Sequence, residues 1–140
     1  MTTLRIFVTK EVLEQSAYCG IDPEKQYKNK DANNDVKNCA IACAVDKIIP
    51  NASVTHCYIG VYPKYSMRFE IPIYSQKVVE FITDFDTCKD VKKRMAMEPF
   101  NFDIEVTDEQ LEEIMKLNNF NEEEFKAAIN ECKTMSLIEK

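Results

Sequence analysis

Four stretches of the chain alternate between apolar and polar residues with a period of two, which is typical of strands that bury one face. They are residues 4–8, 54–62, 67–73 and 100–106. In the last stretch, Phe100, Phe102 and Ile104 face one way and polar residues face the other. Such alternation favours antiparallel pairing, because one face of the sheet stays wet. The second and third stretches read as a hairpin, with Pro72 near a strand end or at an edge, since proline cannot donate to the ladder.

The remaining patterned segments have a helical period and begin at recognisable capping residues. Thr9 would cap a helix over 10–16, and Asp35 or Asn38 would cap the segment that ends at Pro50. Ser75 would cap the helix whose apolar stripe runs from Val78 to Phe85. Thr107 and Gln110 form a capping box before Leu111, and Asn121 would cap the last helix, whose apolar stripe ends at Cys132. A short extra turn is expected over 88–94. The polar stretch 20–35 is expected to be a mobile loop.

This order of elements predicts an α+β fold, in which a four-stranded, mainly antiparallel sheet carries helices packed on one face. Residues 1–106 would form the α+β core. Residues 107–140 would form a C-terminal helical hairpin, packed on the core or appended to it. At 140 residues the chain is long enough to bury a core without disulfide or metal support.

The stretch 38–50 reads NCAIACAVDKIIP and is apolar almost throughout. We expect it to pack on a sheet face, and the residues of that face are Cys57, Ile59, Val61, Phe69 and Ile71. An alternative is a reactive Cys39 in the first turn of a helix, where exposed N–H groups stabilise a thiolate. The only histidine, His56, alternates onto the opposite strand face, so a Cys–His pair is not favoured. A zinc site built from Cys39, Cys43 and Cys57 is a weak signal, because structural zinc takes two closely spaced ligand pairs.

The net charge of −6 is unevenly distributed, since residues 98–140 hold twelve acidic residues and four lysines. This acidic end opposes nucleic-acid binding. It is either a solvated helix face or a negative surface directed at a basic protein partner. The residues expected to bind a partner are Asp108, Glu109, Glu112, Glu113, Glu122, Glu123 and Glu124. The loop 20–35 is the alternative binding segment. The cluster Lys89, Lys92, Lys93 and Arg94 reads as a short charged helix face.

Six cysteines are scattered through mostly apolar segments. The opening MTTLRIFVTK has no export signal, and the apolar runs are far shorter than the roughly 20 residues of a membrane span. We therefore expect reduced, mostly buried thiols and a cytoplasmic protein. No phosphate-binding loop or hydrolase motif is present, and no cofactor or metal is expected.

Three short stretches together resemble a group of small phage and prophage proteins of unknown function. These stretches are Asn38-Cys39-Ala40-Ile41-Ala42, Phe81 to Asp86, and Pro99-Phe100-Asn101-Phe102. The group commonly has proline where this chain has Ala40. The resemblance implies a non-enzymatic, phage-type accessory protein that binds a protein or small ligand, such as a host factor or a host-defence component. A virion structural or packaged protein and a Cys39-dependent enzyme are the alternatives, and the oligomeric state stays open.

Overall fold

The computed structural model describes residues 1–27, 38–50, 52–55, 57–63, 68–117 and 123. The strands are β1 (Thr2–Val8), β2 (Ser53–Val54), β3 (Tyr58–Val61), β4 (Phe69–Pro72) and β5 (Phe100–Val106). The helices are α1 (Lys10–Ser16), α3 (Ala40–Asp46), α4 (Gln76–Thr87), α5 (Val91–Met95) and α6 (Asp108–Leu117), with a 3-10 turn, η1, over Pro23–Lys25. The predicted α+β class is confirmed for the described chain. In that part, no helix is both long and apolar enough to cross a membrane.

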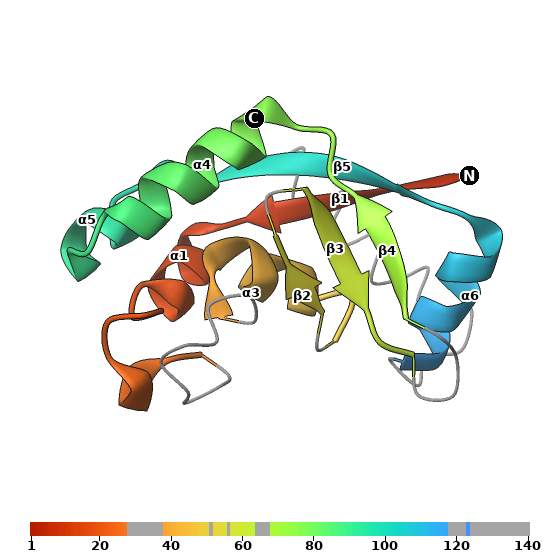
Figure 1. The fold of residues 1–140 in the computed structure, drawn as a ribbon, viewed down its shortest axis with the longest axis horizontal. Helices are drawn as coiled ribbons and strands as arrows, with labels where there is room; N and C mark the ends of the chain where they lie inside the picture. The colour runs from red at the N-terminus through yellow and green to blue at the C-terminus, as the bar shows by residue number, and fades with distance from the viewer. Residues whose placement is uncertain (28–37, 51, 56, 64–67, 118–122, 124–140) are drawn as a thin grey trace.

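The strands form two antiparallel sheets where the sequence predicts one sheet of four strands. β1 pairs with β5 as a two-stranded ribbon, while β2, β3 and β4 form a three-stranded sheet in that order. Figure 1 shows the ribbon running along the molecule, with the three-stranded sheet in front of it. The single four-stranded sheet is therefore not confirmed among the described residues.

The predicted strand 54–62 is instead two strands of a hairpin. The Thr55 N–H donates to the Tyr58 carbonyl at 3.0 Å, and the Thr55 hydroxyl accepts the N–H groups of Cys57 and Tyr58 at 3.3 Å. The chain reverses there, so β2 and β3 pair with each other. Cys57 lies at the turn and is exposed, which overturns its predicted place on the buried face. His56 lies outside the described residues.

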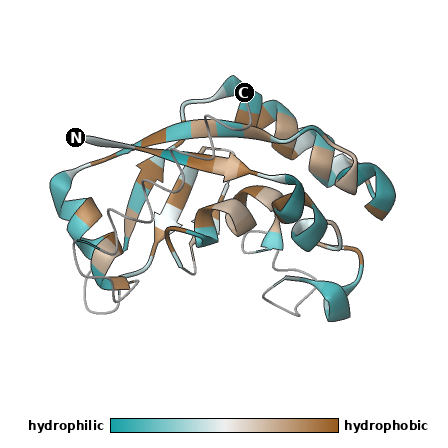
Figure 2. Ribbon diagram, turned by 180° about the vertical axis from the view of Figure 1, so that it is seen from behind, coloured by the Kyte–Doolittle hydropathy of each residue, from teal (hydrophilic) through white to brown (hydrophobic). Residues whose placement is uncertain are grey.

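The β1–β5 ribbon follows the predicted alternation. Leu4 lies opposite Ile104, Ile6 lies opposite Phe102, and all four side chains are buried. On the other face, the Arg5 Nε and Asp103 Oδ1 atoms are 2.8 Å apart in an exposed ion pair. Figure 2 shows apolar and polar segments following one another along these strands. The ribbon thus has one face in the core and one polar face.

Three predicted helix starts are confirmed by hydrogen bonds from side chains. The Thr9 hydroxyl accepts the Val12 N–H, and the Ser75 hydroxyl accepts the Val78 N–H. At α6, the Thr107 hydroxyl accepts the Gln110 N–H at 3.1 Å while the Gln110 amide oxygen accepts the Thr107 N–H at 3.0 Å. This exchange is the reciprocal capping box. The extra turn predicted over 88–94 is α5. The helix predicted over 121–132 lies outside the described residues.

The first part of the predicted mobile loop has a defined structure. Gly20 has a φ of 70°, a conformation that glycine adopts without steric cost. Its N–H donates to the side-chain oxygen of the buried Gln26 at 2.9 Å, across the turn η1. Residues 28–37 lie outside the described part of the chain. Residues 20–27 therefore include a hydrogen-bonded 3-10 turn that the prediction of a loop did not contain.

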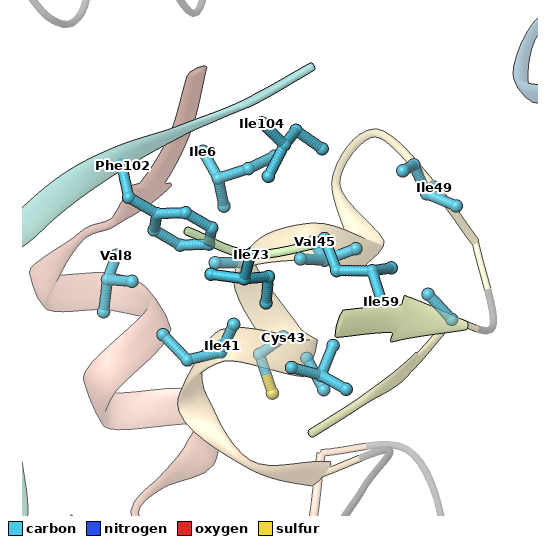
Figure 3. Packing of buried hydrophobic residues seen from close by; sticks show 14 of the residues in the cluster. Ile6, Val8, Ile41, Cys43, Val45, Ile49, Ile59, Ile73, Phe102 and Ile104 are labelled. Carbon is cyan, nitrogen blue, oxygen red and sulfur yellow. The ribbon is translucent and has the colours of Figure 1, made fainter. Parts of the chain in front are cut away.

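The apolar helix α3 occupies the centre of the core. Every residue from Ala40 to Val45 is buried. Figure 3 shows Ile41, Cys43 and Val45 among the side chains of the two sheets. The surrounding labelled residues are Ile6, Val8, Phe102 and Ile104 from the ribbon, and Ile49, Ile59 and Ile73 from the segments on the other side. Burial of Ile59, Val61 and Ile71 in the same cluster agrees with the predicted packing, with Cys57 as the exception.

Replacement of Ile41 by alanine should lower the free energy of unfolding by about 2–5 kcal/mol, because it removes a fully buried side chain and leaves a cavity. The measurement is a urea melt of wild-type and variant protein. Ile21→Ala is the matched control, since Ile21 is exposed and outside the core cluster. A loss for Ile41→Ala no larger than the loss for Ile21→Ala would show that α3 is not the core helix.

Candidate functional site

The first candidate residue, Cys39, is the N-cap of α3. Its Sγ accepts the Ala42 N–H at 3.5 Å, and its backbone is extended, with a φ of −68° and a ψ of 166°. The hypothesis that Asn38 caps this helix is therefore wrong, and Cys39 precedes the first turn. Cys39 is 8% exposed. Its sulfur thus acts as a helix cap near the surface of the core.

The neighbouring Cys43 thiol is held in its neutral form, because its pKa is raised. Burial, and then the proximity of the Cys39 and Cys19 thiols, raises the pKa of the Cys43 thiol. The Cys43 Sγ donates to the Asn38 carbonyl oxygen at 3.5 Å. Within the described ranges, the structure contains no group of three or more potential ligands that could hold a metal ion, and Cys19, Cys39, Cys43, Cys57 and Cys88 are not joined in disulfides. These contacts fit a role of the buried cysteines in core packing better than a role in catalysis or metal binding.

The predicted acidic surface lies in part on α6. Asp108, Glu109 and Glu112 are exposed, Glu113 is partly buried, and Glu123 is exposed beyond the helix. Glu122 and Glu124 lie outside the described residues. Lys116 is the nearby cation, with Nζ 3.9 Å from a Glu112 oxygen and 3.5 Å from a Glu113 oxygen. On the opposite side of the helix, Ile114 is fully buried in the core cluster.

The predicted charged face on α5 is wrong for one of its four members. Lys89, Lys92 and Lys93 are exposed, but Arg94 is only 1% exposed. Its Nε donates to the carbonyl oxygens of Phe85 and Cys88 at 3.1 and 2.7 Å. The guanidinium also lies 4.3 Å from the centre of the Phe85 ring.

A second pair of carbonyls completes the surroundings of Arg94. One terminal nitrogen, Nη1, donates to the carbonyl oxygens of Ala17 and Cys19 at 2.9 and 2.7 Å. The oxygens of Ala17, Phe85 and Cys88 belong to the C-terminal ends of α1 and α4, where the helix dipoles favour a positive charge, and Cys19 lies in the turn that follows α1. Arginine suits this position because its guanidinium presents several donors in a fixed plane, whereas lysine presents a single ammonium group. Arg94 is therefore a structural clamp between two helix ends.

A stacked cluster that the sequence patterns did not reveal lies on the outer face of the β2–β3–β4 sheet. The Arg68 guanidinium lies 5.7 Å from the centre of the Tyr58 ring and 5.3 Å from that of Tyr62. A Cβ placed on Gly60, between the two tyrosines, would come within 3.0 Å of Arg68 Nη2. Glycine therefore makes room for the guanidinium. The available signal was the spacing Tyr58-x-Gly60-x-Tyr62, which puts all three residues on one strand face.

Polar contacts hold this cluster in place. Arg68 Nη2 is 3.2 Å from a Glu70 oxygen, and the Ser53 hydroxyl donates to the Tyr62 hydroxyl at 3.3 Å. A side-chain hydrogen bond with Tyr58 is the largest factor that raises the pKa of Arg68. Tyr62 remains 45% exposed, and Tyr74, two residues beyond the end of β4, is 92% exposed. Among the described residues, the outer sheet face thus combines fixed aromatic rings with the Arg68 cation and the Glu70 anion.

Comparisons of this chain with protein-family models, with curated proteins and with solved structures each found no match.

Replacement of Arg94 by alanine should lower the free energy of unfolding by about 3–5 kcal/mol, because four buried carbonyl oxygens lose their donor. Arg94→Lys should recover only part of this loss, since one ammonium group cannot reproduce the planar donors. Chemical denaturation provides the measurement. Lys93→Ala is the control, because Lys93 is exposed on the same helix and its loss should change stability by less than about 0.5 kcal/mol. Equal effects of the Lys93 and Arg94 changes would contradict the clamp.

Alkylation of the native protein should modify Cys57 first, because it lies exposed at a turn. Cys19, Cys39 and Cys43 should resist until the protein unfolds, since all three are buried and the raised pKa of Cys43 keeps its thiol protonated. Intact-mass counting and peptide mapping after timed iodoacetamide treatment measure the order. A denatured sample, in which every thiol reacts, is the control. Native labelling of Cys39 as fast as that of Cys57 would support the reactive-thiol hypothesis instead.

Proposed function

We propose that this chain is a non-enzymatic, cytoplasmic accessory protein of the phage type that binds a basic partner protein through the acidic surface of α6. The observation that carries the proposal is the exposed row Asp108, Glu109 and Glu112 on a helix whose opposite side is fixed by the buried Ile114. A host factor or a host-defence component is the proposed class of partner.

Helix stability explains only part of this acidic surface. Asp108 and Glu109 are in the first turn of α6, where the helix dipole favours negative charge. Glu112 and Glu113 lie beyond that turn, where the effect of the dipole has faded. Their contacts with the exposed Lys116 are surface ion pairs, which contribute little to stability. Glu112 and Glu113 together outnumber the one lysine that they contact, so a negative charge remains there that can attract a cationic surface.

The geometry of α6 suits a docking surface of fixed shape. The capping box at Thr107 and Gln110 fixes the start of the helix, and Ile114 anchors it to the core. Leu111, Met115 and Leu117 pack against the same core cluster. A partner would therefore meet charges that are already positioned, which lowers the entropy lost on binding.

The surroundings of the thiols support a binding role over a Cys39-dependent reaction. Thiol catalysis requires an accessible thiolate with a base nearby. Cys39 is instead buried as a helix cap, and the adjacent Cys43 has a pKa raised by burial. These observations favour the non-enzymatic reading.

Charge reversal on α6 should slow association with the partner. The variant Glu109→Lys, Glu112→Lys, Glu113→Lys is compared with the control Glu14→Lys, Glu80→Lys, Glu98→Lys, which makes the same change in net charge at exposed sites elsewhere. Proteins that the wild-type chain captures from a cell lysate are purified and their on-rates are measured by stopped flow at low and high salt. The α6 variant should lose about tenfold or more in on-rate at low salt, and the difference should shrink at high salt.

The matched control separates a local surface from overall charge. If both triple variants slow association equally, net charge alone governs the encounter and α6 is not the docking surface. If neither variant changes the on-rate at low salt, the acidic residues form only a solvated helix face. Circular dichroism of both variants checks that the fold is retained.

A further inference from the structure

The outer face of the β2–β3–β4 sheet carries aromatic side chains without an apolar cover among the described residues. Tyr62 and Tyr74 are two of the four exposed large apolar side chains in the described chain, the others being Met1 and Ile21. Tyrosine and arginine are enriched at the centres of protein interfaces, where they combine contact area with polar groups. The cluster of Tyr58, Arg68 and Tyr62 therefore has the composition of an interface.

The charges on this face are self-complementary. Arg68 and Glu70 both project from the segment that leads through β4, two residues apart and hence on one side of it. A two-fold axis passing between them would place Arg68 of one copy against Glu70 of the other, and the reverse. The Arg68–Glu70 pair is neutral overall, so it does not attract a partner of one sign. It does match its own copy turned by half a rotation.

We infer that this chain forms a two-fold symmetric homodimer through the outer face of the β2–β3–β4 sheet, with Arg68 and Glu70 pairing reciprocally between copies. Tyr58 and Tyr62 already hold the Arg68 guanidinium over Gly60, so its side chain is ordered before association. The rings of Tyr58, Tyr62 and Tyr74 supply the apolar contact area of this interface, which the two charged side chains alone do not provide. The residues of this surface differ from those of the acidic row on α6, and the two proposals stand independently.

A charge-swap experiment tests this dimer. Sedimentation velocity over a concentration series should show the wild-type chain passing from its 16.2 kDa monomer to twice that mass. Arg68→Glu alone and Glu70→Arg alone should each raise the dimer dissociation constant by about tenfold or more, because each change places like charges opposite each other twice in a symmetric dimer. An equimolar mixture of the two variants should restore a heterodimer.

A second ion pair provides matched controls. Arg5→Glu and Asp103→Arg alter an exposed pair on the β1–β5 ribbon and change the net charge by the same amounts. These variants should dimerise as the wild type does. Tyr74→Ser, at a 92% exposed side chain that the fold does not need, should weaken the dimer while leaving unchanged the melting temperature measured at concentrations where the protein is monomeric.

Each contrary result overturns the inference. A wild-type chain that stays monomeric throughout the series has no such dimer. Swap variants that dimerise normally would place any dimer on another surface, and a mixture that stays monomeric would exclude the reciprocal pairing. None of these outcomes depends on the partner proposed for α6, so the two ideas fail separately.

Discussion

The burial of α3 from Ala40 to Val45 is the constraint on which the rest of the structure depends. A helix that is apolar on all sides must be covered on all sides, because any uncovered side would expose apolar surface to water. The ribbon, α1 and the three-stranded sheet supply that cover. Alanines at 40, 42 and 44 keep the helix narrow, so these neighbours can approach closely. The two sheets also approach each other where β4 lies near β5, although these two strands are not paired in one ladder.

The three arginines of this chain occupy three different environments. Arg94 is buried and satisfied by carbonyl oxygens at two helix ends. Arg68 lies partly exposed between tyrosine rings, and Arg5 pairs with Asp103 on a polar strand face. The planar guanidinium suits all three sites, since it can stack and donate in several directions at once. The lysines at 89, 92 and 93, by contrast, are exposed.

Local signals in the sequence were enough to predict the starts of α1, α4 and α6 and the pairing faces of β1 and β5. Caps and alternation depend on residues a few positions apart, so a single sequence contains them. The reversal at Thr55 was not visible, because the residues on both sides of it fit one alternating strand. The clamp at Arg94 was hidden for another reason. Its partners are backbone carbonyls from segments distant in sequence, and these leave no trace in residue type.

The candidate binding surfaces also differ in how far the sequence alone could predict them. The acidic row on α6 is a matter of composition, and the sequence therefore identified Asp108, Glu109 and Glu112 directly. The stack on the three-stranded sheet depends on which strand faces coincide in space. Gly60, Tyr62 and Arg68 become neighbours only once β3 and β4 pair with their observed register. A glycine within a strand between two tyrosines was the only local hint.

The pairing of β1 with β5 has a consequence for synthesis on the ribosome. Leu4 pairs with Ile104, so about a hundred further residues must be synthesised after β1 before the β1–β5 ladder can form. At typical translation rates this delay is on the order of 5–20 s. Throughout that time an apolar strand edge is open to wrong partners on other chains. The nascent chain is thus most vulnerable to aggregation before β5 has left the exit tunnel, however stable the finished fold.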